Sequence, residues 1–337
     1  MLNFDEDRFV RIQSGAVAQA PGLHSVVAKA LQAGATNLFL LGSGGAGILM
    51  EPAARLLRSR SAFPVFHEIP AEVLAQGHGH LGAGSLVVIP SLSGTTKESL
   101  EILDHCRARG ATVIGLTAHA DSPLAQRADH TFVNFAEDDT SCESFYLQSL
   151  AVVLAILQER GEIDTYDAVL AELAQLPQAL LEAKRSFEPR AQAWAERFQD
   201  EPYHIFTGAG STWAQAWYYA MCILEEMQWI RTRPVHANDF FHGTLELVEE
   251  GVSVVVLAGE DASRPLAQRV AAFAAERTRK LTVFDTAEIA TPGISPAVRE
   301  LISPILLATL LERVSAHLEV LRDHPLTTRR YYRRVEY

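Results

Sequence analysis

The chain has 337 residues, of which 48% are hydrophobic, and it carries a formal net charge of −12 at pH 7. This length suggests about two domains with substantial cores, and the negative charge makes nucleic acid and anionic membrane surfaces poor partners. The N-terminus, MLNFDEDRF, lacks a signal-peptide core, and no uninterrupted apolar run approaches the roughly 18 residues of a membrane span. Three scattered cysteines, Cys106, Cys142 and Cys222, argue against a disulfide framework or a cysteine-based zinc site. We therefore expect a soluble cytoplasmic protein.

After an expected helical arm over residues 1–36, one pattern occurs twice. An apolar run, a glycine-rich turn and a helical stretch begin with NLFLLGSGGAG at 37–47 and again with YHIFTGAGSTW at 203–213. A second apolar run follows in each half, SLVVIP at 85–90 and SVVVLAG at 253–259. Each second run leads into a loop and a helix. This repetition indicates two related domains in tandem.

A further short strand ends each repeat, TVIGLTA at 112–118 and KLTVFDTA at 280–287. Strands that alternate with helices predict βαβ units and parallel sheets. The expected fold class is therefore α/β, with two doubly wound parallel-sheet lobes joined by a helical connector. The predicted boundaries are an arm at 1–36, a first domain at 37–160, a connector at 161–200, a second domain at 201–323 and a tail at 324–337.

The stretch PSLSGTTKES, residues 90–99, places several hydroxyls between a strand and a helix. One interpretation is helix capping, because Thr95 and Glu98 have the spacing of a capping box. Capping accounts for one or two hydroxyls, but not for Ser91, Ser93, Thr95 and Thr96 together. A helix N-terminus attracts anions, and Gly94 allows a close backbone approach. We therefore predict that this segment binds phosphate through N–H and O–H donors.

The first glycine turn, GSGGAG, also resembles a degenerate dinucleotide fingerprint. It lacks the strict G-x-G-x-x-G spacing, although Glu68 lies near the distance at which an acidic residue binds ribose. A dinucleotide site needs no serine- and threonine-rich loop after a later strand. The sequence therefore favours phosphate binding without a nucleotide cofactor.

The helical stretch WAQAWYYAMCILEEMQWI, residues 213–230, contains two charged residues, Glu225 and Glu226. Such an apolar helix must be buried on several sides. A carboxylate there would lose hydration, which favours proton transfer near neutral pH. The alternative is a structural ion pair with Arg231 or Arg233. Periodicity does not choose between the two glutamates.

His242 follows sixteen residues after Glu226, in the loop HANDFFHGTLEL. Its side chain can act as an acid or a base at neutral pH, although a lone histidine is more often ordinary. His78 and His80, in GHGH, have no nearby cysteine or carboxylate, so we expect them to be solvent-exposed and predict no metal site.

Together these motifs resemble the tandem sugar isomerase (SIS) family, and within it the fructosamine-6-phosphate deglycases. The specific matches are EEMQWI at 225–230, FFHG at 240–243, RPLAQRVAAFAAERT at 264–278 and the tail HPLTTRRYYRRVEY. The likeness spans both expected lobes and the tail. We expect no glutaminase domain like that of the related glucosamine-fructose-6-phosphate synthase, because residue 2 is leucine rather than the nucleophilic cysteine.

The resemblance implies a role for each matching residue. Glu226 would move protons on the carbon skeleton, and His242 would act as an acid or base near the ring oxygen. In the family this histidine often comes from the neighbouring subunit of a homodimer. The sugar phosphate would be held by Ser91, Ser93, Thr95, Thr96 and Ser43. Weaker substrate contacts are expected from Gly44, Gly45, Asp239 and Arg330, and the tail would close over the site.

The sequence departs from the family pattern at several of these positions. The first glycine turn has Gly45 and Ala46 where relatives often carry a hydroxyl, with Ser43 just before them. Asp239 stands where relatives commonly have glutamate, and Thr244 where they have proline. Contacts near the substrate amine are therefore expected to differ.

The resemblance implies an enzyme that hydrolyses a 6-phosphofructosyl amino acid to glucose 6-phosphate and the amino acid, without a cofactor or a metal. Two alternatives share the same loop and base. One is an aldose–ketose isomerase or amino-sugar-phosphate deaminase on the same fold. The other is a non-enzymatic phosphosugar sensor, which the lack of a DNA-binding segment or basic patch disfavours.

Overall fold

The computed structural model describes residues 1–136, 143–332 and 334–336. The chain forms two compact units. Glu6–Pro177 make up the first lobe, and Met1–Asp5 with Gln178–Tyr337 make up the second lobe. The division falls inside the segment expected to be a connector, and the boundaries drawn from the sequence stay a prediction. Cys142 lies outside the described residues, whereas Cys106 and Cys222 are both buried.

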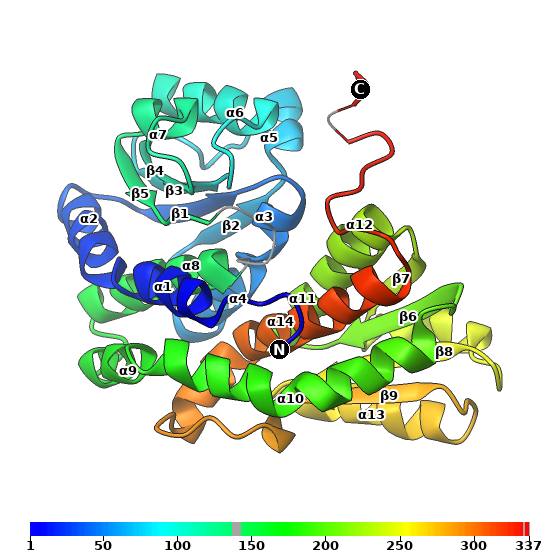
Figure 1. Cartoon of the computed structure of the whole chain (residues 1–337). Helices are drawn as coiled ribbons and strands as arrows, with labels where there is room; N and C mark the ends of the chain where they lie inside the picture. The colour runs from blue at the N-terminus through cyan, green and yellow to red at the C-terminus, as the bar shows by residue number, and fades with distance from the viewer. Residues whose placement is uncertain (137–142, 333, 337) are drawn as a thin grey trace. The chain divides into compact units, whose positions relative to one another are not determined.

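The first lobe contains a five-stranded parallel sheet in the order β2-β1-β3-β4-β5 (Figure 1). Its strands are β1 (Asn37–Leu41), β2 (Val65–Glu68), β3 (Ser85–Pro90), β4 (Thr112–Thr117) and β5 (His130–Val133). Its helices are α1 (Glu6–Val17), α2 (Ala20–Gln32), α3 (Gly44–Ile48), α4 (Glu51–Arg60), α5 (Pro70–Gln76), α6 (Lys97–Ala108), α7 (Pro123–Arg127), α8 (Glu143–Glu159) and α9 (Tyr166–Leu173).

Helices cover both faces of this sheet. One face presents Phe39, Val87 and Val113 to the buried side chains of α6, such as Ile102 and Cys106. α5 and α7 flank α6 on that face, and α4 and α8 lie on the other (Figure 1). The central strands β1 and β3 are buried along their whole length, which explains why they read as continuous apolar runs.

The second lobe contains a four-stranded parallel sheet in the order β7-β6-β8-β9. Its strands are β6 (Tyr203–Gly208), β7 (Arg231–His236), β8 (Ser253–Ala258) and β9 (Leu281–Asp285). Its helices are α10 (Leu176–Phe198, apart from its first two residues), α11 (Thr212–Tyr218), the π-helix η2 (Tyr219–Glu225), α12 (Glu226–Gln228), the 3₁₀ helices η3 (Asp239–His242), η4 (Thr244–Leu247) and η5 (Thr286–Glu288), α13 (Arg264–Ala275) and α14 (Pro296–Leu321).

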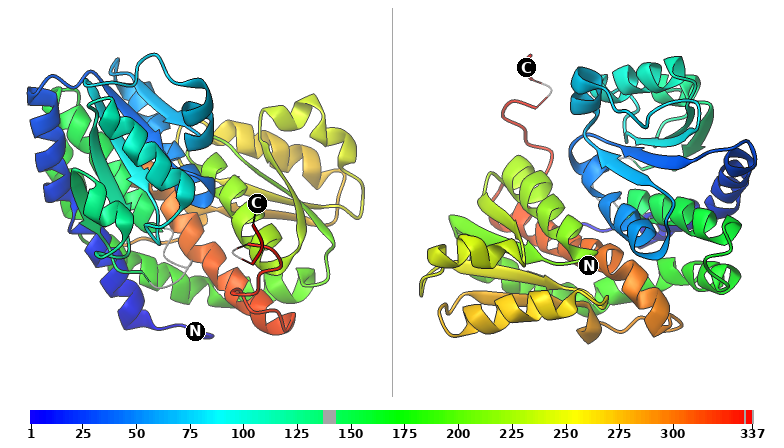
Figure 2. Two further views of the ribbon diagram at one scale, coloured as in Figure 1. Left: turned by 90° about the horizontal axis from the view of Figure 1, so that it is seen from above. Right: turned by 180° about the vertical axis from the view of Figure 1, so that it is seen from behind.

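The faces of the second sheet are covered in the same three-layer manner. Ile205, Val254 and Val256 pack with Val270 and other apolar residues of α13. On the opposite face, aromatic side chains of α10 contact the sheet: Trp194 lies 5.4 Å from the ring of His204. Figure 2 shows helices on both sides of each sheet. These two lobes confirm the predicted α/β fold with parallel sheets.

α14 is the one helix in the described part of the chain that is long and apolar enough to span a membrane by composition. However, 89% of the apolar stretch of this helix is buried inside the protein. It also carries Arg299 and Arg313, which are paired with Glu260 and Glu188. Burial on all sides is expected of a helix in a protein core.

Candidate active site

The strand order of the first lobe places a topological switch point between β1 and β3. These neighbouring strands lead into helices on opposite faces of the sheet, and ligands of such folds bind outside the carboxyl ends of the strands at this switch point. The turn at 43–45 follows β1, and the hydroxyl loop, residues 91–96, follows β3. The sequence-predicted phosphate residues of the first lobe therefore lie at the expected place for a ligand.

The four hydroxyls of this loop are paired with one another. The buried Ser91 lies with its Oγ 3.0 Å from Thr96 Oγ1 and accepts a hydrogen bond from the Gly94 N–H at 3.1 Å. Thr95 Oγ1 donates to Ser93 Oγ at 2.9 Å. The loop thus gathers several O–H groups and backbone N–H groups within a few residues, which is a donor set that suits an anion.

Gly94 holds the loop in a conformation that other residues rarely adopt. Its φ is +63°, and a Cβ at this position would overlap the side chain of Ser122 and lie 2.9 Å from Thr117 Oγ1. Thr117 Oγ1 also donates to the carbonyl of Leu92 at 3.1 Å. Glycine is therefore required both by the backbone and by the close packing under the loop.

The capping-box interpretation of Thr95 and Glu98 is wrong. The N-cap of α6 is Thr96, and it makes no side-chain capping hydrogen bond. The reason is local: the hydroxyl of Thr96 is directed to Ser91 and that of Thr95 to Ser93. The hydroxyls are arranged around the loop rather than used to end the helix.

The first glycine turn is more open than the hydroxyl loop. Ser43 is the N-cap of α3 but makes no capping hydrogen bond with its side chain. Gly44 is exposed, with φ at +56°, and a Cβ there would have no heavy atom of the described residues within 4 Å. Gly45 lies in the first turn of α3. The turn therefore presents backbone and one hydroxyl to open space.

In the second lobe, Glu226 lies at an irregular helix end. The π-helix η2 directly precedes it, and Trp229 ends the segment in the left-handed conformation with φ at +55°. The Ile230 N–H donates to the carbonyl of Leu224 at 2.9 Å. Inserted π-turns and left-handed residues other than glycine are uncommon, and both are frequent at functional sites.

Glu226 is paired with an arginine and is only partly buried. Its Oε1 accepts a hydrogen bond from Arg329 Nε at 2.9 Å, and 34% of its side chain is exposed. The carboxylate therefore loses less hydration than the sequence predicted, because part of the side chain stays exposed. The predicted alternative partners, Arg231 and Arg233, are both exposed, and the arginine that contacts Glu226 comes from the tail.

The neighbouring Glu225 has a different environment. It is exposed, and its Oε1 accepts a hydrogen bond from Thr232 Oγ1 at 2.5 Å. This contact joins the end of η2 to strand β7. The geometry therefore distinguishes the two glutamates, which helical periodicity had left equivalent.

The C-terminal tail is fastened to this helix end by several contacts. Gln228 Nε2 donates to the carbonyl of His324 at 2.7 Å, and the rings of Trp229 and His324 lie 4.5 Å apart. The guanidinium of Arg330 lies 4.0 Å from the centre of the Trp229 ring. The unusual conformation of Trp229 thus places its ring where it can bind the tail.

His242 is the last residue of the 3₁₀ helix η3, and its side chain is exposed. The helix is anchored by Phe240, which is fully buried and packs against Phe273 at a ring distance of 5.8 Å. Asp239, at the start of η3, is exposed and accepts a hydrogen bond from Asn238 Nδ2 at 3.2 Å. The buried phenylalanine fixes the backbone that carries the exposed imidazole.

The expectation that both histidines of GHGH are solvent-exposed holds in part. His80 is exposed, whereas His78 is half-buried, with its ring 4.6 Å from that of Phe66. Within the described residues, no group of three or more His, Cys, Asp or Glu side chains is arranged to hold a metal ion.

Comparisons with known proteins agree with this architecture. A family model for the SIS domain matches residues 33–158. A structure of a proposed phosphosugar isomerase from Salmonella typhimurium LT2 superposes with a TM-score of 0.89 at 27% identity, covering 96% of this chain and 97% of that one. A corresponding structure from Bacillus subtilis gives a TM-score of 0.87 at 28% identity, covering 96% and 99%. These findings define an α/β protein that contains an SIS domain over residues 33–158 and shares its overall fold with phosphosugar isomerase-like structures.

Two curated relatives narrow the assignment. Fructosamine deglycase FrlB of Bacillus subtilis is 29% identical over 304 residues, 89% of this chain and 92% of that protein. Fructoselysine 6-phosphate deglycase of Escherichia coli K12 is 30% identical over 239 residues, 71% of this chain and 68% of that protein. The chain belongs to the SIS domain family and is an enzyme of that family.

Proposed function

We propose that this enzyme is a fructosamine-6-phosphate deglycase, which converts a 6-phosphofructosyl amino acid and water into glucose 6-phosphate and the free amino acid. The observation that carries the proposal is the hydroxyl loop, whose Ser and Thr side chains lie at the switch point of a sheet and are not used to cap α6. The names of the two deglycase relatives support the same reaction.

The phosphate group would be bound by neutral donors. Ser91, Ser93, Thr95 and Thr96 offer hydroxyls, and the N-terminus of α6 offers backbone N–H groups with a partial positive charge. Because the protein as a whole has a charge of −12, its overall field repels an anion. A concentrated set of local donors is therefore needed to bind a phosphorylated sugar. Ser43 and the backbone of Gly44 and Gly45 would complete the set.

Proton transfer would be carried out by Glu226 and His242. In this mechanism His242 helps to open the sugar ring, and Glu226 then removes a proton from C1, next to the C2 carbonyl. The resulting enaminol takes a proton at C2, which leaves a C1 imine. Water adds to this imine and the amine departs, so C1 becomes the aldehyde of glucose 6-phosphate. Steps of this kind are each accelerated roughly 10²–10⁴-fold by a positioned acid or base.

The amino-acid part of the substrate carries a carboxylate, for which the tail supplies a cation. Arg330 is exposed and is held over Trp229 at 4.0 Å. Arg329 is engaged with Glu226. We therefore assign the contact with the amino acid to Arg330, with Asp239 as a further candidate near the substrate amine.

Product analysis tests the reaction directly. The purified enzyme is incubated with a panel of 6-phosphofructosyl amino acids, and glucose 6-phosphate and free amine are measured together. Equal release of both is expected, and Glu226→Gln should abolish it. Conversion between an aldose and a ketose phosphate, or release of ammonia from an amino-sugar phosphate, would instead identify the isomerase or deaminase alternative. Binding of phosphosugar without turnover would identify a sensor.

We further propose a homodimer in which each active site uses His242 of the neighbouring chain. The exposed position of His242 supports this arrangement. Mixing Glu226→Gln and His242→Ala chains tests it, because mixed dimers then contain one intact site of two. Random exchange should restore about a quarter of wild-type activity. If each site uses its own His242, mixing restores nothing.

We also propose that the enzyme acts in the cytoplasm and has neither nucleic acid nor membrane as a partner. Both described cysteines are buried, and Cys106 is a free thiol, which is compatible with a reducing compartment. Burial is the main influence on the Cys106 thiol and raises its pKa to about 12. That thiol is therefore a packing group of the core rather than a nucleophile.

A further inference from the structure

The second lobe has its own switch point, corresponding to the one that we assign to phosphate in the first. β6 and β8 are neighbours in the sheet, and their following helices, α11 and α13, lie on opposite faces. Gly42 and Gly208 end the first runs of the two repeats, and two residues later Gly44 and Gly210 have φ values of +56° and +57°. The two turns therefore share a left-handed glycine at the same position.

The loops after the second strands also correspond. α6 begins after the N-cap Thr96, and α13 begins after the N-cap Ser263. Counting back two residues from each cap places Asp261 at the position of Gly94. By this count the second lobe has a carboxylate two residues before its helix cap, where the hydroxyl loop has Gly94, although Asp261 does not share the left-handed φ of Gly94.

The carboxylate of Asp261 joins the turn after β6 to the loop after β8. Its Oδ2 accepts hydrogen bonds from the Ser211 N–H at 2.9 Å and from Ser211 Oγ at 2.6 Å. Its Oδ1 accepts from the Ser263 N–H at 2.8 Å and from the Ser263 hydroxyl. Burial alone would raise the pKa of Asp261, but these hydrogen bonds outweigh it and lower the pKa below its usual value. Both oxygens thus sit among N–H and O–H donors.

The same space is open in the first lobe. A Cβ on Gly210 would lie 2.6 Å from each oxygen of Asp261, whereas a Cβ on Gly44 would have no heavy atom of the described residues within 4 Å. An Asx turn alone, in which Asp261 binds the N–H two residues ahead, explains the contact with Ser263. It does not explain the two hydrogen bonds from Ser211, which lies fifty residues away in the chain.

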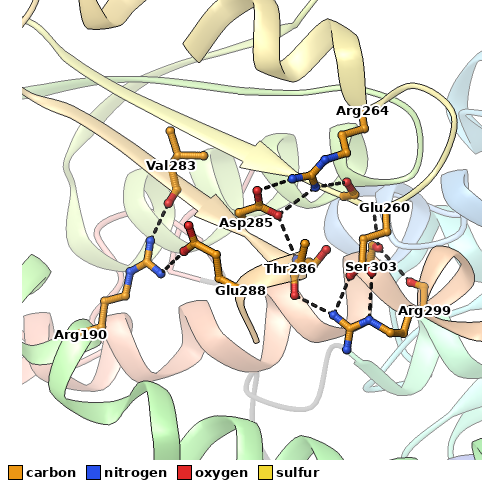
Figure 3. Close-up of polar contacts among 11 residues, drawn as sticks. Arg190, Glu260, Arg264, Val283, Asp285, Thr286, Glu288, Arg299 and Ser303 are labelled. Carbon is orange, nitrogen blue, oxygen red and sulfur yellow. Dashed lines mark hydrogen bonds and ion pairs between the residues drawn. The ribbon is translucent and has the colours of Figure 1, made fainter. Parts of the chain in front are cut away.

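The charged neighbours of this carboxylate are paired among themselves. Arg264 binds Asp285 through both of its terminal nitrogens, and Arg299 binds Glu260 at 2.9 and 2.7 Å (Figure 3). Both arginines therefore have a carboxylate partner other than Asp261. The four donors around Asp261 come from serine side chains and backbone, as they do in the hydroxyl loop.

We propose that the second lobe retains an anion-binding socket, formed by the N–H and hydroxyl groups of Ser211 and Ser263, which the chain fills with the carboxylate of Asp261. The ligand class of the socket is a phosphate dianion or a phosphate monoester. Asp261 thereby limits phosphate binding to the first lobe. The existence of the socket does not rest on the proposed deglycase activity.

Replacing Asp261, so that its carboxylate no longer occupies the socket, tests the proposal. Asp261→Ala removes the carboxylate and leaves the four donors, whereas Asp261→Asn keeps an oxygen and a side chain of the same size in place. Binding of inorganic phosphate to the full-length protein is measured by isothermal titration calorimetry, together with thermal unfolding in phosphate and in chloride at equal ionic strength. We expect Asp261→Ala to bind one more phosphate per chain than the wild type, and Asp261→Asn to bind no more than the wild type.

The thermal unfolding measurement tests the proposal even if Asp261→Ala folds poorly. If loss of the carboxylate leaves the donors unsatisfied, Asp261→Ala should melt at a lower temperature in chloride, and phosphate should restore its melting temperature more than that of Asp261→Asn. A folded Asp261→Ala protein with no additional phosphate would overturn the proposal. So would a destabilised one that phosphate does not rescue. If the wild type binds no phosphate but Asp261→Ala does, the socket is supported and only the proposed phosphate site of the first lobe is refuted.

Discussion

Arg329 donates a hydrogen bond from Nε to Glu226 Oε1 at 2.9 Å, across 103 positions of sequence. Arg329 is largely buried, with 12% of its side chain exposed, and its Nη1 also donates to the carbonyls of Leu326 and Thr328. The guanidinium is thus fixed by its own tail and in turn fixes the carboxylate. This makes Arg329 a positioning residue for the proposed base.

Replacing Arg329 should slow turnover more than it weakens substrate binding. In Arg329→Gln the carboxylate of Glu226 loses its fixed donor and its orientation, so we expect kcat to fall about tenfold or more, a barrier increase of roughly 1.4 kcal/mol, with KM little changed. Arg329→Lys should recover part of the rate. Steady-state kinetics on a phosphofructosyl amino acid measure both parameters.

The matched control for this change is Arg330→Gln, which removes an adjacent arginine that lies over Trp229. Because we assign Arg330 to the amino-acid carboxylate, this variant should raise KM and leave kcat close to that of the wild type. An unchanged kcat in Arg329→Gln, or identical profiles for both variants, would contradict a positioning role.

The two adjacent glutamates should behave differently. Glu226→Gln removes the proposed base, and we expect kcat to fall by about 10²-fold or more while the melting temperature stays near that of the wild type. Glu225→Gln changes an exposed residue that contacts Thr232, so its activity should remain within about threefold of the wild type. Equal losses in the two variants would show that Glu226 has no special chemical role.

The central strands of both lobes could be predicted from sequence because they are buried on both faces. NLFLL, SLVVIP and SVVVLA read as unbroken apolar runs before glycine or serine, and the structure has strands at each of them. β7 has no such signal. Its sequence, RTRPVH, is exposed or partly buried except at Val235. It also contains Pro234, which an edge strand tolerates because one side of its backbone needs no partner.

Only the part of the candidate site that is formed by one continuous stretch of sequence could be predicted. The hydroxyl loop is a contiguous segment, so its composition revealed it. The pairing of Glu226 with Arg329 depends on the path of the tail, and no periodicity connects residues that far apart. Similarly, the π-helix before Glu226 contacts the distant helix α14, where Ser315 Oγ donates to the buried Tyr219 hydroxyl at 3.1 Å. Sequence patterns with a period of 3.6 residues do not signal such an insertion.

Gly94 should be the least replaceable residue of the hydroxyl loop. Gly94→Ala places a Cβ in a left-handed conformation and against Ser122, so we expect the free energy of unfolding to fall by about 3 kcal/mol. Gly79→Ala is the control, because its Cβ would meet no described atom within 4 Å and its φ is not positive. Chemical denaturation of both variants measures the difference. Similar stabilities would mean that the loop can relax around a side chain.

The stability of the second lobe should depend on pH through Glu188. Burial favours the neutral form of this carboxyl, but hydrogen bonds from Arg313 and the Leu2 N–H outweigh that effect and lower its pKa from 4.5 to about 2. Arg313 is fully buried, and its Nε lies 2.7 Å from Glu188 Oε2. The folded chain therefore holds the ionised carboxylate more strongly than the unfolded chain does.

Because the pKa is lowered on folding, the stabilisation from Glu188 is complete above pH 4.5 and is lost as the pH falls toward 2. Glu188→Gln removes the carboxylate that hydrogen-bonds to the buried Arg313 and leaves it, among the described residues, only Glu312 at 3.9 Å, so we expect a loss of up to about 3–5 kcal/mol at pH 7. The difference in the free energy of unfolding between wild type and Glu188→Gln should decrease steadily from pH 5 to pH 3. Urea denaturation across this range measures it, with the exposed Glu196→Gln as control. A gap that stays constant with pH would show that the loss arises from packing rather than from the ionised pair.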